Sequence, residues 1–316
     1  MKSKVRIAAL LTLLGVGGLA QASCGGAFCT VNTGSEAHGD WAGPGTRLDL
    51  HYEFVDQRQL RSGTRKVSPA GEIGGEPDEL STVNRILKLT VDHSFDDRWG
   101  MTVQLPYVRR SHLHINNSDF PGPTAESWSI GGVGDTRVVG RYQLWRDDTG
   151  KAAGLRFGLK LPTGRTTVIN ADGARAERTL QPGTGTTDAV LGAYWRDALG
   201  SGDWFASLNW QRALDQHEDF RPGSAFSADL GISRPLGGIW SGQVQLNAVW
   251  RGRDSGAQAE PSLSGGHSLF LSPGVSAAID QHTTLYGYLQ LPLRQYVNGT
   301  QLTAKWGAII GFSRMF

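Results

Sequence analysis

The sequence predicts an all-β fold, an antiparallel transmembrane β-barrel of about twelve strands of the bacterial outer-membrane type. Three observations predict it. Apolar and polar residues alternate with a period of two along most of the chain. After the first twenty or so residues, no apolar run approaches the roughly 18 residues that a membrane-spanning helix needs. Long polar connections alternate with short turns between the segments, as in outer-membrane barrels.

The composition is consistent with this fold and excludes other classes. The 316 residues include 43 glycines, and charged residues make up only 19%, below the roughly 25% of soluble domains. The net charge of +2 implies no broad attraction to nucleic acid, and we expect no nucleic-acid partner. Aromatic and aliphatic residues run the length of the chain, which argues against disorder.

Residues 1–22 are predicted to be a cleaved signal peptide. A positive start with Lys2, Lys4 and Arg6 precedes an apolar stretch over 7–19, and Ala20-Gln21-Ala22 offers a small-x-small cleavage site. The mature chain would then begin near Ser23. The alternative is lipid attachment at Cys24, although Gln21 stands where such sites usually carry an apolar residue.

The next segment, 23–45, contains the only two cysteines, Cys24 and Cys29. Export to an oxidising compartment favours a disulfide between them. A metal or redox pair is the alternative, but C-x4-C without a partner histidine is a weak metal signature. The segment is Gly-rich and long enough either to lie in the periplasm or to enter the barrel as a plug.

Residues 46–316 are predicted to form the barrel. In the first segment the apolar face carries Leu48, Leu50, Tyr52 and Phe54, and the polar face carries Arg47, Asp49, His51 and Glu53. The same alternation recurs, in order, within 83–92, 99–110, 137–144, 155–161, 189–195, 204–211, 226–233, 240–251, 269–279, 285–293 and 302–312. These segments have roughly ten to thirteen residues, whereas strands of globular proteins usually have about five or six. The greater length suits tilted crossings of a bilayer.

The apolar face must point outward if the barrel is this large. Side chains still fill a barrel of around eight strands, but a larger apolar bore would be left empty. A polar, water-filled lumen with apolar residues facing lipid avoids that cavity. A charge facing lipid at mid-bilayer costs roughly 2–4 kcal/mol. The predicted outer face carries almost no charge except near segment ends, as at Arg85.

The connections favour the same topology. Long polar connections follow the odd segments, at roughly 59–81, 111–132, 164–186, 213–223 and 252–267, and short turns follow the even ones. Outer-membrane barrels have long extracellular loops and short periplasmic turns. Trp99, Trp195, Trp204 and Trp240 lie beside the short turns, as an interfacial girdle requires, whereas the alternation places Trp145 on the lumen side.

The last residues resemble the C-terminal assembly signal of outer-membrane proteins. That signal is a polar residue, a Gly two positions later, and two apolar or aromatic residues at alternate positions. Lys305, Gly307, Ile310 and Phe312 match it, and the terminal Phe316 adds to the likeness. The resemblance implies the barrel-assembly machinery and outer-membrane lipid as partners.

Three central stretches resemble a known family. They are Gly134-Asp135-Thr136-Arg137, the run Gly158-Leu159-Lys160-Leu161-Pro162-Thr163-Gly164, and the run from Gln181 to Asp188. They are similar to the outer-membrane barrels labelled "MetA-pathway of phenol degradation", over roughly 130–230. Membership would imply a channel or transporter for small solutes, with aromatic ones as candidates, and no catalytic residues.

The predicted lumen face carries the residues that would set selectivity. Its basic residues are Arg47, Lys88, Arg110, Arg137, Arg141, Arg156, Lys160, Arg196 and Arg251, and its acidic residues are Asp49, Glu53, Asp92, Asp188 and Asp229. The aromatic residues are Tyr194, Phe205, Phe270, Tyr286 and Tyr288. One interpretation is a ladder of ion pairs that stiffens the wall. The other is a selectivity surface, in which the basic excess favours anions.

Metal and enzyme sites are the remaining alternatives. His112 and His114 share a face, and with His51 they would offer three metal ligands, but two alternating histidines without a nearby carboxylate pair are more often incidental. We therefore expect no metal and no cofactor. The enzyme alternative is an outer-membrane barrel that acts on lipids. Outer-membrane phospholipases use a paired Ser and His, but the adjacent Ser111 and His112 would point to opposite faces of a strand and could not form such a pair. A structural barrel that sheaths a partner protein is the third alternative.

The function predicted from these observations is passive diffusion of small solutes through a polar lumen, without catalysis, in the outer membrane of a Gram-negative bacterium.

Overall fold

The structure is a computed structural model that describes residues 31–34, 44–69, 78–117, 122–170 and 173–316. Its strands are β1 (Gly45–Gly63), β2 (Arg65–Lys66), β3 (Asp78–Ser94), β4 (Trp99–Asn116), β5 (Thr124–Val133), β6 (Thr136–Arg146), β7 (Ala152–Leu161), β8 (Asp188–Leu199), β9 (Gly202–Ala213), β10 (Ala225–Gly237), β11 (Trp240–Arg251), β12 (Gly266–Ala278) and β13 (Thr283–Met315). A short 3-10 turn, η1 (Pro261–Leu263), precedes β12. The predicted signal peptide and the Cys24–Cys29 pair lie outside the described residues.

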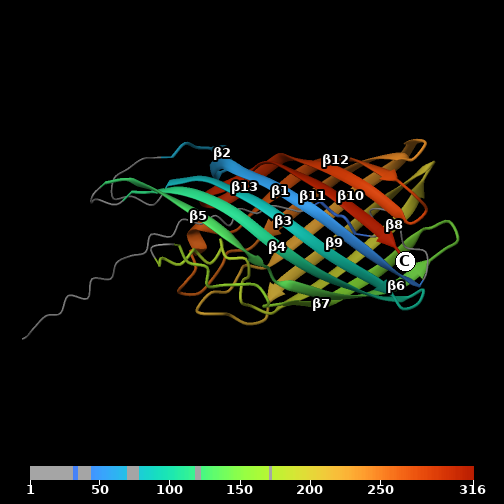
Figure 1. Ribbon diagram of the computed structural model, residues 1–316, viewed down its shortest axis with the longest axis horizontal. Helices are drawn as coiled ribbons and strands as arrows, with labels where there is room; N and C mark the ends of the chain where they lie inside the picture. The colour runs from blue at the N-terminus through green and yellow to red at the C-terminus, as the bar shows by residue number, and fades with distance from the viewer. Residues whose placement is uncertain (1–30, 35–43, 70–77, 118–121, 171–172) are drawn as a thin grey trace, which may run out of the picture.

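The strands form a closed antiparallel barrel (Figure 1). Eleven strands make the ring, in the order β1, β3, β4, β6, β7, β8, β9, β10, β11, β12 and β13, and β13 pairs back to β1. The small β2 pairs with β1, and β5 pairs with β4. Closure leaves no unpaired edge in the ring, which is what a sheet surrounded by lipid requires.

β13 contains both of the last two predicted segments. Its residues as far as Val297 pair with β12, and those from Thr300 onward pair with β1. Gly299 lies between the two halves at a φ of 60°, a conformation that favours glycine. The ring has eleven labelled strands, but β13 crosses the wall twice, once beside β12 and once beside β1. The wall therefore has twelve crossings, against the expected count of about twelve.

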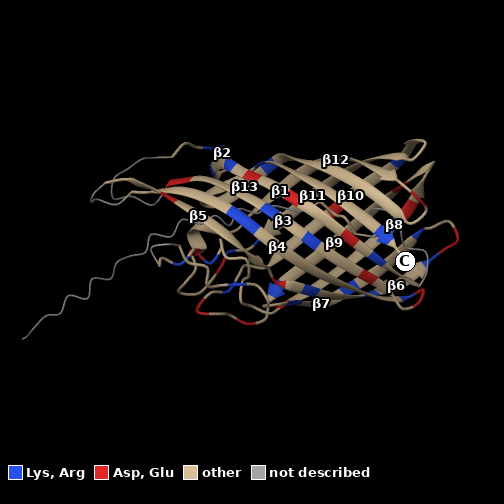
Figure 2. Cartoon of the chain, viewed as in Figure 1, with Lys and Arg blue, Asp and Glu red and all other residues tan. Residues whose placement is uncertain are grey.

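The side chains have the orientation that the alternation predicts. Leu50, Leu155 and Leu230 on the outer surface are 40%, 42% and 49% exposed, whereas the inward Asp49 and Asn247 are at 1% and 0%. Figure 2 shows acidic and basic positions distributed along the strands of the wall and in the connections at both ends. The barrel is therefore polar inside and apolar outside. Within the described residues, no helix is long and apolar enough to cross a membrane.

The connections divide the barrel into two different ends. Short turns at 95–98, 147–151, 200–201, 238–239 and 279–282 lie at the end that also carries the C-terminus (Figure 1). Longer connections, including 162–187, 214–224 and 252–265, lie at the opposite end. We call these the short-turn end and the long-loop end. The alternation of long and short connections is as predicted.

The predicted long connection at 111–132 is wrong in extent. β4 continues to Asn116, and β5 returns along it from Thr124 to Val133, so that most of this region is a paired hairpin. The missed signal is a short alternation in which Trp128 and Ile130 are buried while Ser127 and Ser129 are exposed. Trp128 and Ile130 pack against Ala176 and Leu180 of the 162–187 connection.

β5 and β6 are two parts of one interrupted crossing, because both pair with β4. The break falls at Gly134-Asp135, opposite Pro106, which has no backbone N–H to donate to a ladder. The Gly134 N–H donates instead to the Pro106 carbonyl at 2.8 Å. The interruption frees Asp135 from the ladder.

The expected position of Trp145 on the lumen side is wrong. A register shift between Gln143 and Trp145 in the β6–β7 pairing inserts an extra residue, and a β-bulge of this kind reverses the face on which later residues lie. Trp145 is 42% exposed and stacks on Trp195, with ring centroids 6.0 Å apart. It therefore belongs to the outer aromatic girdle at the short-turn end.

Candidate functional site in the barrel lumen

Alternate residues of β1 form a continuous charged ladder on the lumen wall. Arg47, Asp49, His51 and Glu53, which we call the β1 ladder, are each at most 2% exposed. His51 lies between two carboxylates, with Nδ1 at 2.8 Å from Asp49 and Nε2 at 2.9 Å from Glu53. The Arg47 guanidinium lies 3.3 Å from Asp49. Strand geometry explains the ladder, because residues two apart share a face.

Neighbouring strands complete the β1 ladder. From β3, Lys88 Nζ lies 2.6 Å from Glu53, and Asp92 lies 2.9 Å from Arg47. From β13, the Tyr286 hydroxyl donates to Asp49 at 2.7 Å. Basic and acidic side chains thus pair with one another along this part of the wall. This part of the wall fits the structural interpretation of the lumen charges better than the selectivity interpretation.

A short stretch of the N-terminal segment lies inside the lumen. Val31 is 3% exposed and packs with Tyr286, Tyr288 and Ile309. Asn32 is held by paired backbone contacts, since its N–H donates to Gln245 Oε1 at 3.1 Å and its carbonyl accepts from Gln245 Nε2 at 2.9 Å.

Further contacts attach the same stretch to other parts of the wall. The Asn32 side chain donates to Ser207 on β9 at 3.0 Å, and the Thr33 carbonyl accepts from Arg47 on β1 at 3.0 Å. Residues 31–34 are therefore attached to β1, β9 and β11.

Four basic residues form a strip on β6 and β7. The strand register sets Arg137 opposite Lys160 and Arg141 opposite Arg156. Like charges directly opposite one another destabilise a sheet, so this arrangement costs stability. Arg137 donates to Gln211 at 2.6 Å, and Arg141 donates to Ser94 at 2.8 Å. The Arg156 guanidinium lies over the Tyr194 ring, 5.0 Å from its centroid. We call these residues the basic strip.

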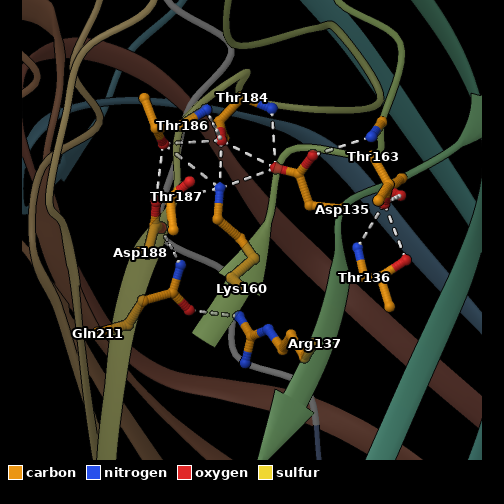
Figure 3. Close-up of polar contacts among 12 residues, drawn as sticks. Asp135, Thr136, Arg137, Lys160, Thr163, Thr184, Thr186, Thr187, Asp188 and Gln211 are labelled. Carbon is orange, nitrogen blue, oxygen red and sulfur yellow. Dashed lines mark hydrogen bonds and ion pairs between the residues drawn. The ribbon is translucent and has the colours of Figure 1, made fainter. Parts of the chain in front are cut away.

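Lys160 joins the three stretches that carry the family resemblance (Figure 3). Its Nζ lies 2.8 Å from Asp135 and 3.1 Å from Asp188, and it also donates to Thr184. Asp135 in turn accepts from the Thr184 N–H at 2.9 Å. The resemblance motifs therefore meet in one buried polar cluster that joins the break between β5 and β6 to the start of β8.

Two glycines of the same motifs allow this close approach. A Cβ on Gly164 would lie 2.5 Å from the Gly183 Cα, and a Cβ on Gly183 would lie 2.6 Å from the Gly164 backbone. The Gly164 N–H donates to Asp135 at 3.1 Å. The two backbones touch at the base of the 162–187 connection, which explains why both positions are glycine.

The inward aromatic residues lie against glycines on neighbouring strands. Pairs in which a Cβ on the glycine would overlap the ring are Gly154 with Tyr194, Gly231 with Phe205, Gly274 with Tyr288 and Gly311 with Tyr286. All four rings are at most 8% exposed. The glycines let each ring lie flat on the wall, so the rings occupy less of the bore.

The other predicted lumen residues fall into separate groups. Asp229 accepts from Ser207 at 2.9 Å and from Asn247 at 2.8 Å. Tyr288 donates to Gln243. Arg251 lies apart, at the end of β11, where it pairs with Asp254 at 3.0 Å. Arg110 donates to the Thr179 carbonyl at 2.9 Å, and Arg196 pairs with Asp203 at 3.0 Å.

Sequence reasoning missed several members of these groups. Asp135 and Thr184 stood inside the resembling motifs, but only the fold shows that they converge on Lys160. Asn32 and Gln245 carried no charge or motif that would single them out. Their contact joins residues 213 positions apart, which no local pattern indicates.

The predicted assembly residues lie on the strand that closes the barrel. Gly307, Ile310 and Phe312 pair with Val55, Tyr52 and Leu50 of β1. Ile310 and Phe316 are 70% and 71% exposed, so their side chains are accessible from the outer surface.

The structure does not bring His51 together with His112 and His114, and it does not pair Ser111 with His112. His51 belongs to the β1 ladder and is not part of a group with His112 and His114. Ser111 is exposed, while His112 is 2% exposed and its Nδ1 lies 2.9 Å from Thr82 Oγ1. The two neighbours lie on opposite faces, as predicted.

Comparison with solved structures shows the fold. The chain is similar to the COG4313 outer membrane channel from Pseudomonas putida F1, at a TM-score of 0.68 and 15% identity over 91% of this chain and 100% of that chain. It is more distantly similar to the toluene transporter TbuX of Ralstonia pickettii, at 0.45 and 10% over 87% and 90%. The transport unit of the autotransporter AIDA-I from Escherichia coli gives 0.49 and 12% over 86% and 90%.

The likeness to the COG4313 barrel defines the fold as a closed β-barrel of the kind found in outer membranes. No protein-family model matches the chain. No curated protein matches it either. The resemblance to the "MetA-pathway of phenol degradation" barrels therefore stays a prediction from the motifs.

Proposed function

We propose that this protein is an outer-membrane channel through which small solutes diffuse passively, with anionic and aromatic solutes preferred. The observation that carries the proposal is the closed barrel with buried charged residues on its inner wall and exposed leucines on its outer wall. A wall of this kind separates lipid from a polar path. The COG4313 barrel with the same fold is described as an outer membrane channel, which supports the proposal.

The basic strip supports a preference for anions. Its four cations lie on two adjacent strands, and three of them contact the neutral groups of Gln211, Ser94 and Tyr194. Rings of Arg and Lys favour anions in channels. The ring faces of Tyr194, Tyr286 and Tyr288 add an aromatic surface to the same interior.

Residues 31–34 support a restricted bore. They fasten the N-terminal segment to three parts of the wall, and we propose that this segment acts as a plug. Passage of a solute would then need a path beside residues 31–34 or their displacement. The terminal strand, with Gly307, Ile310, Phe312 and Phe316, is proposed to carry the assembly signal.

The test is a single-channel recording of the refolded mature chain in a planar bilayer under a salt gradient. The proposal expects discrete conductance steps with an anion-selective reversal potential. Arg137→Gln with Arg141→Gln should move the reversal potential toward cations. The matched control is Arg85→Gln, because the Arg85 guanidinium lies 5.9 Å from the Phe54 ring and not in the basic strip. Absence of conductance would overturn the channel, and an unchanged reversal potential would overturn the role of the basic strip.

A further inference from the structure

At the long-loop end, two histidines and a glutamate that the channel proposal does not use lie close together. Glu79, His112 and His114 each present one ligand atom, and these atoms all lie within 4.8 Å of one another. All three residues are buried, with exposures of 3%, 2% and 9%. The expectation of no metal depended on the absence of a carboxylate pair near the histidines. The structure brings Glu79 to them from one neighbouring strand and Glu126 from the other.

The strand register explains why the three residues converge. His114 on β4 lies opposite Glu79 on β3 and opposite Glu126 on β5. A register shift between Glu79 and Ser81 marks a β-bulge. Without the bulge, Glu79 and Thr82 would face opposite ways, because they are three residues apart. With it, both are buried on the same inner face as the histidines.

The distances between the ligand atoms suit a small divalent cation. His112 Nε2 lies 2.9 Å from His114 Nδ1 and 3.6 Å from Glu79 Oε2. Tetrahedral ligands at the 2.0–2.1 Å bond lengths of Zn²⁺ lie about 3.3 Å from one another. The observed separations fall on either side of this value.

In each histidine, the ring nitrogen that would not bind the metal has the kind of partner that metal-binding histidines need. Glu126 lies 3.4 Å from His114 Nε2. A carboxylate can only accept, so this nitrogen carries the proton and Nδ1 is left with its lone pair. Thr82 Oγ1 lies 2.9 Å from His112 Nδ1 and can accept the proton of that nitrogen. Without a metal, His112 Nε2 and His114 Nδ1 share a hydrogen bond in which one of the two nitrogens donates. With the proton of His112 on Nδ1, Nε2 has a lone pair for a metal that takes the place of this hydrogen bond. Such partners fix the tautomer and the orientation of liganding rings.

We propose that Glu79, His112 and His114 form a Zn²⁺ site at the long-loop end of the barrel. Two imidazoles and a carboxylate are a ligand set that zinc accepts, with one position left for water. The ion would link β3 to β4, the strand that continues into the β4–β5 hairpin. Zinc binding would stabilise the folded barrel, because the unfolded chain does not hold the three ligands together.

The test measures Zn²⁺ binding by the refolded full chain after treatment with a chelator, using competition with a chromophoric zinc indicator. We expect one ion per chain, and Co²⁺ in its place should give the intense visible absorption of a tetrahedral site. Glu79→Gln, His112→Ala and His114→Ala should each remove the stoichiometric site. Thr82→Val should weaken binding roughly 10- to 100-fold, the usual effect of losing an outer partner.

The control is His217→Ala, which removes a half-exposed histidine that lies 3.9 Å from Glu218 on another connection and should leave binding unchanged. Folding of each variant is checked by the heat-dependent shift of the barrel band in gel electrophoresis. If one histidine variant does not fold, Glu79→Gln still decides the question, because it keeps the shape of the side chain. The proposal fails if the wild-type chain binds no stoichiometric Zn²⁺, or if binding persists in the Glu79 and histidine variants.

Discussion

At the scale of single residues, the lumen depends on glycines that make room for aromatic rings. On Gly231, a Cβ would lie 2.2 Å from Phe205 Cε1 and 2.6 Å from its Cζ, and Phe205 is 4% exposed. A side chain at this position must push the ring off the wall. Such pairs help to explain why glycine is so frequent on strands that would otherwise favour β-branched residues.

We predict that Gly231→Ala destabilises the barrel by roughly 1–3 kcal/mol, the usual cost of overpacking a filled interior. The check is the urea midpoint of the refolded protein in lipid vesicles. Gly287→Ala is the matched control, because the nearest atom to a Cβ there is the Ile309 carbonyl oxygen at 3.5 Å. Equal stability of the two variants would mean that Phe205 does not need the space.

The alternation predicted which residues face the lumen but not how they pair. The period of two predicts that Arg47, Asp49, His51 and Glu53 share one face, and in the structure all four are buried. Their partners Lys88, Asp92 and Tyr286 depend on the register between strands, which the sequence does not specify locally. Glu79 was missed for the same reason, because only a β-bulge brings it to the histidine pair.

At the scale of elements, three of the short turns are closed in the same way, by an aspartate side chain that accepts hydrogen bonds from the backbone of the turn. Asp96 Oδ1 accepts from the Arg98 and Trp99 N–H groups at 2.7 Å each. Asp147 Oδ1 accepts from Thr149 at 3.0 Å and Lys151 at 3.1 Å, and Asp280 Oδ1 accepts from His282 at 2.7 Å. These backbone hydrogen bonds close the turn and stabilise the carboxylate.

The turns should therefore lose stability in acid. Backbone hydrogen bonds from Trp99 and Arg98 hold the pKa of Asp96 below its ordinary value of 3.8. The pKa of Asp147 is lowered mainly by the Thr149 side chain, and that of Asp280 mainly by the His282 N–H. Because the folded pKa is the lower one, the charged form stabilises the turns above about pH 4, and this contribution is lost as the pH falls through the folded value.

We predict that replacing Asp96, Asp147 and Asp280 together by Ala lowers the unfolding midpoint at neutral pH. The triple Asn variant should keep most of the stability, because an amide oxygen accepts the same hydrogen bonds, and it should lack the acid-dependent loss. Urea unfolding between pH 3 and 7 measures both. An Asn variant with the acid sensitivity of the wild type would show that other groups cause it.

The N-terminal stretch 31–34 is the second element with a distinct prediction. Asn32→Ala with Gln245→Ala removes the side chains that hold this stretch to β9 and β11. Net losses of about 1 kcal/mol per hydrogen bond are usual, and three hydrogen bonds are removed. A loss of about 3 kcal/mol should raise the undocked population roughly 150-fold.

Single-channel recordings should then show longer or more frequent high-conductance states. Gln143→Ala is the control, because the Gln143 amide donates to the Asp97 carbonyl at 2.9 Å, a hydrogen bond that does not involve residues 31–34. Identical gating in the double variant and the wild type would contradict the plug.

The elements that were predicted least well are those in which the period of two is broken. A bulge at Gln143–Trp145 moved Trp145 to the outer surface, where it stacks with Trp195. The break at Gly134-Asp135 divides one crossing into β5 and β6, of which only β6 was expected as a strand. Alternation carries no information about where an extra residue is inserted, so local irregularities of this kind must come from the structure.

At the scale of the whole molecule, the account depends on one physical arrangement. In the proposed channel, the exposed leucines of the outer wall face hydrocarbon, and the β1 ladder and the basic strip line the inner wall. Chain closure through β13 and β1 makes this arrangement possible without an exposed edge. The channel proposal, the plug and the girdle of tryptophans at the short-turn end all follow from it.

The most direct test compares adjacent residues on β7, Leu155 and Arg156, in lipid vesicles. Leu155 is 42% exposed on the outer wall, and Arg156 belongs to the basic strip in the lumen. A nitroxide spin label is placed on a single cysteine at each position, in a background with Cys24 and Cys29 replaced by serine. Power saturation then measures collisions with oxygen, which partitions into lipid, and with a water-soluble nickel chelate. We predict that the label at 155 meets mainly oxygen and the label at 156 mainly nickel; equal accessibility at both positions, or the reverse order, would contradict a barrel that is apolar outside and wet inside.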